Sequence, residues 1–495
     1  MKKNFYLMNL SLLLLFTLLS PSLKLQAQKN SIAINWNNTL TISKTTPTLQ
    51  VVVNPMLKRG SSMHNGTFEA LKNLGADYVR FVPWFPYPHM AVPELKEPAK
   101  TQTFWDFSQI DPVVNDFMEA QKGHSVVMNF STIPAWMFKT NKPVDYPSDP
   151  DSVFWSYNRG NEFRDTTLKE LTGYYVRVFS WYTKGGFTDE LGVFHKSGYF
   201  YNFPYWEVLN EVDFEHFGNV QIYTKVYDAI VTALKKIAPQ TKFIGLALVF
   251  ENNPEWFEYF LNPLNHDHGV PLEGISYHFY GTPDFPEQTL DYYQYSFFNK
   301  ADAFLDRVRY IENIRQRLAP QTFTTINEIG NILGDQNGTS IPDAYWNLSG
   351  AMYAYIYVEL SKIGIDVAGE SQLVGYPTQY PDVTMIDWKN AKPNARYWTL
   401  KLLKDNFGPG DKLVNTDANS SQVVAQAFIT PKGKKLLLIN KRNKNIQMKF
   451  PAEIKNAEMF SVDGDSNENP PIQHHVTDST ITLKPFSVSV IDFNG

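Results

Sequence analysis

The sequence predicts an α/β protein: a (β/α)8 TIM barrel followed by an accessory C-terminal β-sandwich domain. Between residues 49 and 409, eight short apolar segments of strand character alternate with segments of helical character. Strands that alternate with helices form parallel sheets, and eight strand–helix units are typical of a closed barrel. From residue 410 onward only short strands remain. A chain of 495 residues is long enough for both parts.

The predicted barrel strands are rich in β-branched and aromatic residues, and the predicted helices follow them one by one. The strands are residues 49–55, 77–84, 125–130, 205–213, 242–249, 274–280, 323–328 and 366–373. The helices are residues 67–74, 107–122, 168–182, 220–237, 254–261, 301–318, 345–363 and 395–406. Gly75 directly follows the first of these helices and Pro239 lies just beyond the fourth, and both are typical stop signals. An open doubly wound sheet is the rival fold, but its first strand is normally followed by a glycine-rich turn, and residues 54–57 contain no glycine.

Short strands with turns between them characterise both ends of the chain. In the C-terminal part, residues 410–495, they are residues 421–429, 434–440, 447–450, 458–462, 480–483 and 487–493. This pattern predicts a β-sandwich beside the barrel. Residues 28–48 also alternate apolar and polar side chains, as in Ile32, Ile34 and Trp36, which predicts half-buried strands. These strands either join the sandwich or stand apart from it.

Residues 1–27 have the character of a secretory signal peptide rather than of folded structure. Lys2 and Lys3 form a basic start, residues 10–19 are apolar, and Ala27 ends a plausible cleavage site. The apolar run is short for a membrane span, so we expect export, with an uncleaved anchor as the alternative. The chain has no cysteine, which excludes disulfides and thiolate metal sites. Together these features predict a bacterial protein of the periplasm or the exterior.

The formal net charge of −5 argues against nucleic acid as a partner. Binding to phosphate backbones relies on clustered lysine and arginine, and the one basic cluster, residues 432–444, has the pattern of exposed strand and turn charges. No segment after the signal peptide is apolar for long enough to span a membrane. The oligomeric state does not follow from the sequence.

The fourth predicted strand, residues 205–213, carries Asn210 and Glu211 near its carboxyl end. Buried Asn and Glu cost free energy unless they are paired, so this strand end indicates a site. Glu328 ends the seventh predicted strand, and in a parallel barrel both strand ends lie on the face that holds active sites. Two carboxylates across a cleft can cleave a glycosidic bond, with retention of configuration when they lie roughly 5–5.5 Å apart.

Residues 206–211, Trp-Glu-Val-Leu-Asn-Glu, resemble the Asn-Glu strand of glycoside hydrolase clan A, the retaining barrel enzymes. This resemblance implies that Glu211 is the acid/base and Glu328 the nucleophile. It also implies that Arg80, on the second strand, and His278 and Tyr280, on the sixth, lie beside the nucleophile. Within the clan the sequence is most similar to family 39, the β-xylosidase and α-L-iduronidase family, which combines a barrel with a β-sandwich.

Further polar and aromatic residues at strand ends are candidates for substrate binding. They are Asn129, Trp136, Asn210 and Glu370, with Trp84 and Trp388 as further aromatic candidates. Core packing is an equal alternative for Trp84 and Trp136.

No cofactor and no metal site are expected. The segment 266–268, His-Asp-His, has no matching run of ligands. Residues 463–468 resemble a calcium loop only loosely, so a solvated turn competes with a calcium site near Asp463 and Asp465.

These observations predict an exported retaining glycoside hydrolase that acts on oligosaccharides or polysaccharides, β-xylosidase-like or a related β-glycosidase. One alternative is an endo-acting glycanase of another clan A family. The other is a non-catalytic carbohydrate-binding barrel, which would keep the aromatic residues but would not need both glutamates. Sugar, anomer and linkage stay open.

Overall fold

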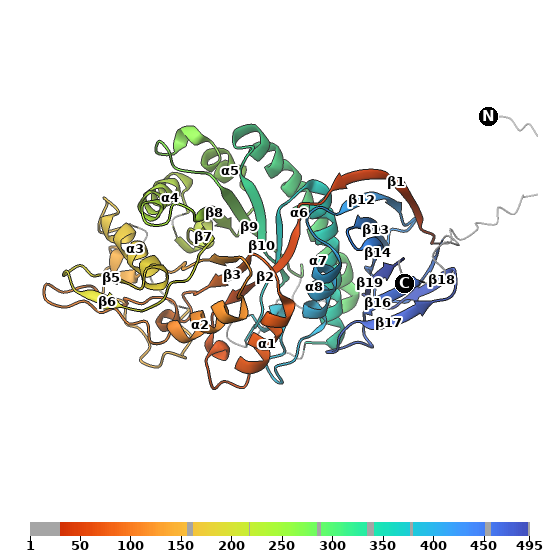
Figure 1. Ribbon diagram of the computed structural model, residues 1–495, viewed down its shortest axis with the longest axis horizontal. Helices are drawn as coiled ribbons and strands as arrows, with labels where there is room; N and C mark the ends of the chain where they lie inside the picture. The colour runs from red at the N-terminus through yellow and green to blue at the C-terminus, as the bar shows by residue number, and fades with distance from the viewer. Residues whose placement is uncertain are drawn as a thin grey trace, which may run out of the picture.

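The computed structural model describes residues 30–155, 162–216, 218–284, 289–333, 341–376, 380–450 and 457–493. The expected signal peptide, residues 1–27, lies outside these described residues. The described part forms an eight-stranded closed parallel barrel with helices around it and a C-terminal antiparallel sheet domain beside it (Figure 1). The predicted fold class is therefore confirmed. Within the described residues, no helix has both the length and the apolar character needed to cross a membrane.

The barrel strands follow the chain in order, and the last one closes the ring by pairing with the first. They are β2 (Thr46–Val52), β3 (Val79–Val82), β4 (Val126–Met128), β7 (Tyr205–Glu207), β8 (Lys242–Leu248), β9 (Gly274–Gly281), β10 (Phe323–Asn331) and β11 (Val367–Glu370). Every neighbouring pair is parallel. The carboxyl ends of all eight strands therefore meet on one face.

One helix follows each barrel strand, and together the helices cover the outside of the barrel. They are α1 (His64–Leu74), α2 (Asp111–Ala120), α3 (Lys169–Thr183), α4 (Val220–Lys235), α5 (Pro254–Phe260), α6 (Leu290–Leu318), α7 (Asp343–Ile363) and α8 (Ala395–Asn406). Gly75 ends α1 in a left-handed conformation with φ 58°, as its position in the sequence predicts. Helix α6 begins earlier than expected.

The C-terminal domain is built on a seven-stranded sheet in the order β1-β12-β13-β14-β19-β16-β17. Its strands are β1 (Ala33–Ile42), β12 (Lys412–Asp417), β13 (Val423–Thr430), β14 (Gly433–Asn440), β16 (Ala457–Val462), β17 (Ile472–Val476) and β19 (Val488–Asp492). A two-stranded sheet of β15 (Ile446–Lys449) and β18 (Thr480–Leu483) shares one buried cluster with it, in which Met448 and Leu483 contact the same core as Val414 and Leu436. The two sheets thus pack together as layers.

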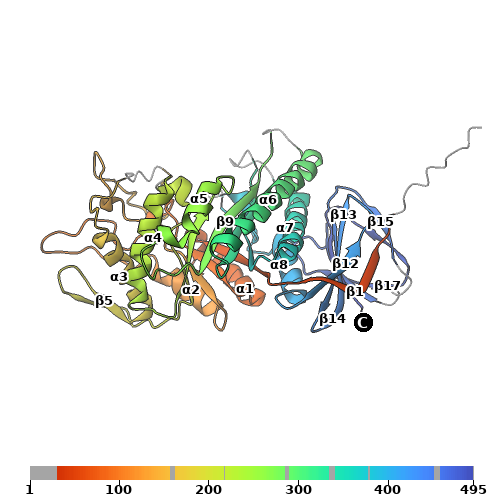
Figure 2. The same ribbon diagram turned by 90° about the horizontal axis from the view of Figure 1, so that it is seen from above.

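Strand β1 pairs with β12 in this sheet, so residues 33–42 belong to the same sheet as the C-terminal strands, and the chain crosses from there to the barrel. The sheet lies against the barrel on the side of α7 and α8 (Figure 2). This arrangement places the second domain away from β3, β4 and β7.

Two parts of the structure differ from the sequence-based expectation. The fourth strand is only Tyr205–Glu207, because Leu209 and Glu211 adopt positive φ angles of 68° and 42° that interrupt the ladder, and a π-helix, Val212–His216, follows. A small hairpin of β5 (Gly186–Thr188) and β6 (Phe194–Lys196) lies between α3 and β7 and was not predicted.

Candidate active site

The chain after β7 brings Asn210 and Glu211 to the carboxyl face of the barrel. Backbone hydrogen bonds from Val208 N to Ile244 O (2.9 Å) and from Glu211 N to Ala247 O (2.8 Å) hold this segment against β8. Between these two anchors Leu209 has a left-handed backbone. Non-glycine residues in this conformation are uncommon and concentrate at functional sites.

A buried ion pair between Glu207 and Arg80 lies at the base of the site. Glu207 is fully buried and is ion-paired with the Arg80 guanidinium. Its two carboxylate oxygens also accept hydrogen bonds from Asn129 Nδ2 (2.5 Å), Ser276 Oγ (2.5 Å) and Asn327 Nδ2 (2.6 Å). A buried carboxylate is tolerated when it is paired and hydrogen-bonded in this way. Glu207 therefore links β7 to β3, β9 and β10 and to the segment that follows β4.

Arg80 connects this base to Glu328 and Asn210, two of the residues that the sequence predicts for the site. Its Nη1 donates to Glu328 Oε1 (2.6 Å) and to Gln50 Oε1 (2.7 Å), and its Nη2 donates to Asn210 Oδ1 (2.6 Å). A planar guanidinium can make several such bonds at once in a fixed geometry. Arg80 thereby fixes Glu328 and Asn210 relative to each other.

Glu328, on β10, has a hydrogen-bond donor at each carboxylate oxygen. Oε1 accepts from Arg80, and Oε2 accepts from Tyr280 Oη at 2.6 Å. Burial alone would raise the pKa of Glu328, but the charges of His278 and Arg80 and the Tyr280 hydrogen bond outweigh it and lower that pKa. Glu328 is thus held in its ionised form.

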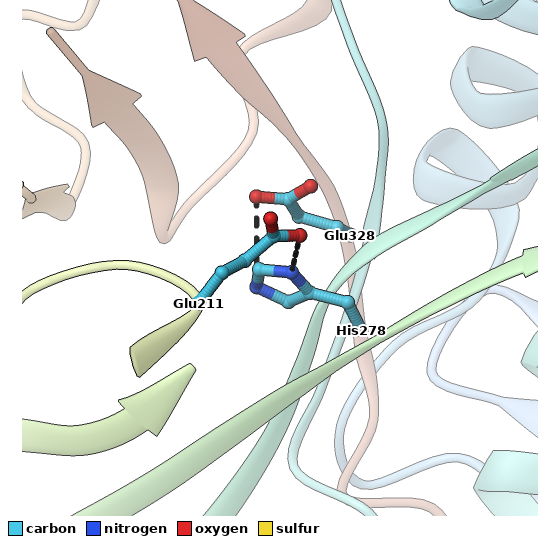
Figure 3. Close-up of side chains that lie close together, drawn as sticks. All are labelled: Glu211, His278 and Glu328. Carbon is cyan, nitrogen blue, oxygen red and sulfur yellow. Dashed lines mark hydrogen bonds and ion pairs between the residues drawn. The ribbon is translucent and has the colours of Figure 1, made fainter. Parts of the chain in front are cut away.

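Glu211 lies opposite, and the ring of His278 contacts both carboxyl groups from one side (Figure 3). His278 Nδ1 is 3.0 Å from Glu211 Oε1, and Nε2 is 3.5 Å from Glu328 Oε1. Burial raises the pKa of Glu211, the His278 hydrogen bond opposes this shift, and the negative charge of Glu328 reinforces it. The two carboxyl groups therefore have pKa values shifted in opposite directions.

One oxygen of Glu211, one of Glu328 and one ring nitrogen of His278 all lie within 4.8 Å of one another. For two carboxyl groups in a glycosidase, a separation of about 5–5.5 Å goes with direct attack on the sugar, whereas about 6.5–9.5 Å leaves room for a water. The observed proximity fits the former geometry. The same three atoms could also surround a metal ion, but both oxygens of Glu328 already accept hydrogen bonds and the Arg80 cation lies beside them, so a second cation would be repelled.

A cavity of about 440 Å³ opens above these groups. Polar side chains form part of its wall: Gln50, Asn210, Glu211, Glu215, Tyr280, Glu328 and Gln372. Aromatic side chains supply much of the rest: Trp84, Phe85, Trp155, Phe214, Phe250 and Tyr380. Small-molecule sites of about 300–1,000 Å³ usually combine apolar walls with a few placed polar groups.

The structure brings six of the nine predicted site residues together: Arg80, Asn210, Glu211, His278, Tyr280 and Glu328. It places the other three elsewhere. Asn129 is buried and supports Glu207 and the Leu209 carbonyl rather than lining the cavity. Trp136 donates to Glu94 O, has Arg164 over its ring, and lines a different cavity.

The expected substrate contact of Glu370 is corrected to an internal ion pair. Glu370 is fully buried, accepts a hydrogen bond from Arg396 Nε at 2.9 Å, and does not line the cavity. Of the two further aromatic candidates, Trp84 lines the cavity and Trp388 does not. Strand position alone cannot separate these cases, because alternate side chains of a strand point to opposite faces.

Sequence reasoning missed Glu207, Gln50 and Glu215. Glu207 is a charged residue inside a short apolar strand, and this misplaced charge is a signal that could have found it. Gln50 lies on β2 and connects Arg80 to Ser371 Oγ, to which its Nε2 donates at 2.8 Å. Glu215 reaches the cavity only through the π-helix, which has no sequence pattern of its own.

The two clusters discounted as metal sites have partners within the protein. His266 is buried, with Nδ1 2.6 Å from Asp228 Oδ1 and Nε2 2.6 Å from Phe260 O. Asp463 accepts from the Asp465 backbone N–H (2.9 Å), and Asp465 pairs with Lys484.

No protein-family model and no curated protein sequence matches the chain. Solved structures do. A family 51 arabinofuranosidase from Xanthomonas axonopodis pv. citri superposes with a TM-score of 0.64 at 13% identity, covering 94% of this chain and 99% of that one. A family 30 endoxylanase from Clostridium papyrosolvens gives 0.58 at 12% identity, covering 93% and 99%. A glucosidase from Croceicoccus marinus gives 0.60 at 13% identity, covering 94% and 98%.

The fold matches that of clan A glycoside hydrolases. The shared coverage includes both the barrel and the C-terminal sheet domain. At this identity the likeness concerns the fold alone, and the three enzymes act on different sugars by their names. The chemistry of this chain must therefore be argued from its own residues.

Proposed function

We propose that the protein is a retaining glycoside hydrolase, with Glu328 as the nucleophile and Glu211 as the acid/base. The observation that carries this proposal is the pair itself: one carboxyl group from the segment after β7 and one from β10, with oxygens within 4.8 Å and with pKa values shifted in opposite directions. Pairs of titratable groups whose environments separate their pKa values mark the acid and the base of a site.

In the first step Glu328 Oε attacks the anomeric carbon while protonated Glu211 donates its proton to the leaving glycosidic oxygen. The bond to the leaving alcohol breaks and a glycosyl ester of Glu328 forms. In the second step ionised Glu211 takes a proton from water, the oxygen attacks the anomeric carbon, and the Glu328 carboxylate leaves. Two displacements at one carbon retain its configuration.

The surrounding residues have distinct tasks in this scheme. Arg80 and Tyr280 hold Glu328 ionised and oriented, each through a 2.6 Å hydrogen bond. His278 contacts both carboxyl groups and links the state of one to the other. Asn210 lines the cavity beside the nucleophile, where its amide can meet the sugar 2-hydroxyl. Contacts to this hydroxyl strengthen in the transition state.

The substrate we propose is an oligosaccharide or polysaccharide cleaved at a β-glycoside, in the manner of the β-xylosidases of family 39. Support for the clan comes from residues 206–211, and support for the family comes from His278 and Tyr280 on the sixth strand together with the pairing of a barrel and a second domain. We also propose that the protein is exported to the periplasm or the cell exterior, on the strength of the signal-like residues 1–27. Cell fractionation with and without these residues tests the second point.

An endo-acting glycanase is the second candidate, and one observation favours it. Trp136 lines a second cavity of about 760 Å³, built by the segments after β3 and β4 at the same end of the barrel as the catalytic cavity. A longer sugar chain could extend over these segments. Product lengths from a polysaccharide decide between the two: single sugars indicate exo action, and mixed oligomers indicate endo action.

The test of the reaction uses Glu328→Gly on a panel of aryl glycosides. We expect the variant to lose turnover and sodium azide to restore release of the aryl alcohol, because azide enters the space of the missing carboxylate and attacks the anomeric carbon to give a glycosyl azide. Full activity of Glu328→Gly would remove the assignment. Tyr277→Phe, on the neighbouring strand and outside the cavity lining, is the matched control that should keep activity.

A further inference from the structure

The catalytic cavity contains a third carboxylate, Glu215, which the mechanism does not use. Glu215 comes from the π-helix Val212–His216, directly after the Glu211 segment, and its backbone N–H donates to Glu211 O at 2.6 Å. Its side chain is almost fully buried yet lines the cavity. A carboxylate in this position faces whatever sugar the cavity holds.

Two donors hold one oxygen of the Glu215 carboxylate. Trp84 Nε1, from the segment after β3, donates to Glu215 Oε1 at 2.5 Å, and Asn210 Nδ2 donates to the same oxygen at 3.2 Å. Charge-assisted hydrogen bonds of this kind are short and strong. They tie Glu215 to Asn210, which Arg80 holds in turn, so the third carboxylate has a fixed position relative to the nucleophile.

The described part of the cavity wall carries charge of one sign only. Among the described residues that line it, three are carboxylic acids (Glu211, Glu215 and Glu328) and none is a lysine, arginine or histidine. The cation below the floor, Arg80, is already paired with Glu207 and Glu328. His278 is buried and contacts both Glu211 and Glu328. An anionic sugar would therefore meet negative groups without a lysine or arginine partner on the described wall.

From these contacts we infer that Glu215 selects neutral sugars: its carboxylate accepts hydrogen bonds from sugar hydroxyls and keeps uronic acids out of the cavity. Hydroxyl groups are donors that an ionised carboxylate accepts well. A uronate would place a second unit charge near Glu215, whose carboxylate is almost fully buried, and like charges repel strongly in such surroundings. The inference rests on the proposed function, and of the two substrate types of family 39 it favours the xyloside over the iduronide.

The experiment measures kcat/KM for matched pairs of aryl glycosides that differ only at C6, the glucoside with the glucuronide and the galactoside with the galacturonide. The wild type, if it accepts hexosides, is expected to prefer the neutral member by at least about a hundredfold. If the wild type does not accept hexosides, the aryl xyloside serves as the neutral reference. Glu215→Gln keeps the shape but removes the charge, and we expect it to narrow the neutral-to-uronide ratio by about tenfold or more.

Glu215→Asp separates charge from reach. It keeps the negative charge but withdraws it from the sugar, so we expect lower kcat/KM on the neutral glycoside with the uronide still rejected. The ratio is informative because damage to the fold would lower both members of a pair together. If Glu215→Gln does not fold, the neutral-to-uronide ratio of the wild type and the kinetics of Glu215→Asp still test the role of Glu215.

The outcomes distinguish the inference from the function on which it rests. Turnover of neutral glycosides with an unchanged ratio in Glu215→Gln would overturn the role of Glu215 and leave the hydrolase intact. A preference of the wild type for uronides would also overturn the role of Glu215. A wild type that cleaves no glycoside of the panel, neutral or acidic, would overturn the proposed function and the inference together.

Discussion

Arg80 Nη1 donates a 2.6 Å hydrogen bond to Oε1 of Glu328, and the same guanidinium is ion-paired with Glu207 in the interior of the barrel. One buried cation thus neutralises a structural carboxylate and a reacting carboxylate together. The arrangement makes the stability of the barrel and the state of the nucleophile depend on the same side chain.

Substitution Arg80→Met should therefore damage both properties. It leaves Glu207 and Glu328 buried without their cation, and breaking a buried pair in this way costs about 3–5 kcal/mol of unfolding free energy. We also expect kcat/KM to fall by more than about a hundredfold, because an electrostatic partner of the reacting group is lost. Urea unfolding and aryl glycoside kinetics measure the two effects.

The matched control is Arg59→Met. Arg59 pairs with Asp116 on the surface, and 59% of its side chain is exposed. Exposed pairs contribute about 0–1 kcal/mol, so this variant should resemble the wild type in both assays. Equal effects of the two substitutions would contradict the role given to Arg80.

Tyr280→Phe removes the donor at the other oxygen of Glu328. Loss of a hydrogen bond to a charged group should lower kcat/KM by about 10–100-fold. The Tyr280 hydrogen bond lowers the pKa of Glu328, so its removal raises that pKa, and the nucleophile becomes protonated at higher pH. The acidic limb of the pH–rate profile should therefore move to higher pH.

Tyr277→Phe controls for the loss of a hydroxyl on the same strand. Tyr277 is buried, and its Oη has no hydrogen-bond partner within the described residues. We expect an unchanged pH profile for this variant. A Tyr280→Phe profile identical to that of Tyr277→Phe would show that the contact to Glu328 has no effect on ionisation.

His278→Gln should move both limbs of the pH profile in one direction. The charge of His278 lowers the pKa of Glu328, and its hydrogen bond and charge lower the pKa of Glu211. Without the imidazolium both pKa values rise, so activity begins at higher pH and also ends at higher pH. The measurement is kcat/KM against pH, and limbs that move apart or toward each other would contradict the coupling.

Glu370→Gln tests the correction made for this residue. Burial raises the pKa of Glu370 to about 7, although the Arg396 charge and hydrogen bond oppose the shift. The pKa of this carboxyl group is higher in the folded state than in the unfolded state. The free energy of unfolding of the protein therefore falls as the pH rises from the unfolded-state pKa toward 7. The variant should lack this decline, which amounts to at most about 3 kcal/mol, and should keep kcat/KM within about threefold.

Glu69→Gln, on the exposed face of α1, is the control for this pH series. It should reproduce the wild-type dependence of unfolding free energy on pH. If Glu370→Gln instead abolishes activity while Glu69→Gln does not, the result would contradict a purely internal role and support the substrate contact that the sequence predicts for Glu370.

The barrel, the sheet domain and the two central glutamates could be predicted because each depends on local pattern. Alternation of strands and helices fixes the barrel, and the barrel places the ends of its fourth and seventh strands on one face. The actual shape of the site depends on other features. Leu209 and Glu211 have left-handed backbones, and a π-helix follows them. These features arise from tertiary contacts such as the bond from Glu211 N to Ala247 O.

The local sequence pattern also could not predict which residues pair with the buried polar groups. Asn129 and Glu370 have the strand positions of substrate-binding residues, yet one supports Glu207 and the other pairs with Arg396. Which face of a short strand points inward depends on the register of the closed barrel, and a shift of one residue reverses it. Glu207 is the opposite case: its strand position gave no reason to expect a role in the site, and its burial is explained only by the ion pair with Arg80 across the barrel.

The most direct test of the account is to locate the covalent intermediate. The wild type is treated with a 2-deoxy-2-fluoro glycosyl fluoride of the sugar it cleaves, which slows both steps but leaves a good leaving group for the first. Peptide mass spectrometry then identifies the labelled residue. The account predicts one glycosyl ester, on Glu328. A label on Glu211 or on any other residue, or inhibition without a covalent label, would contradict it.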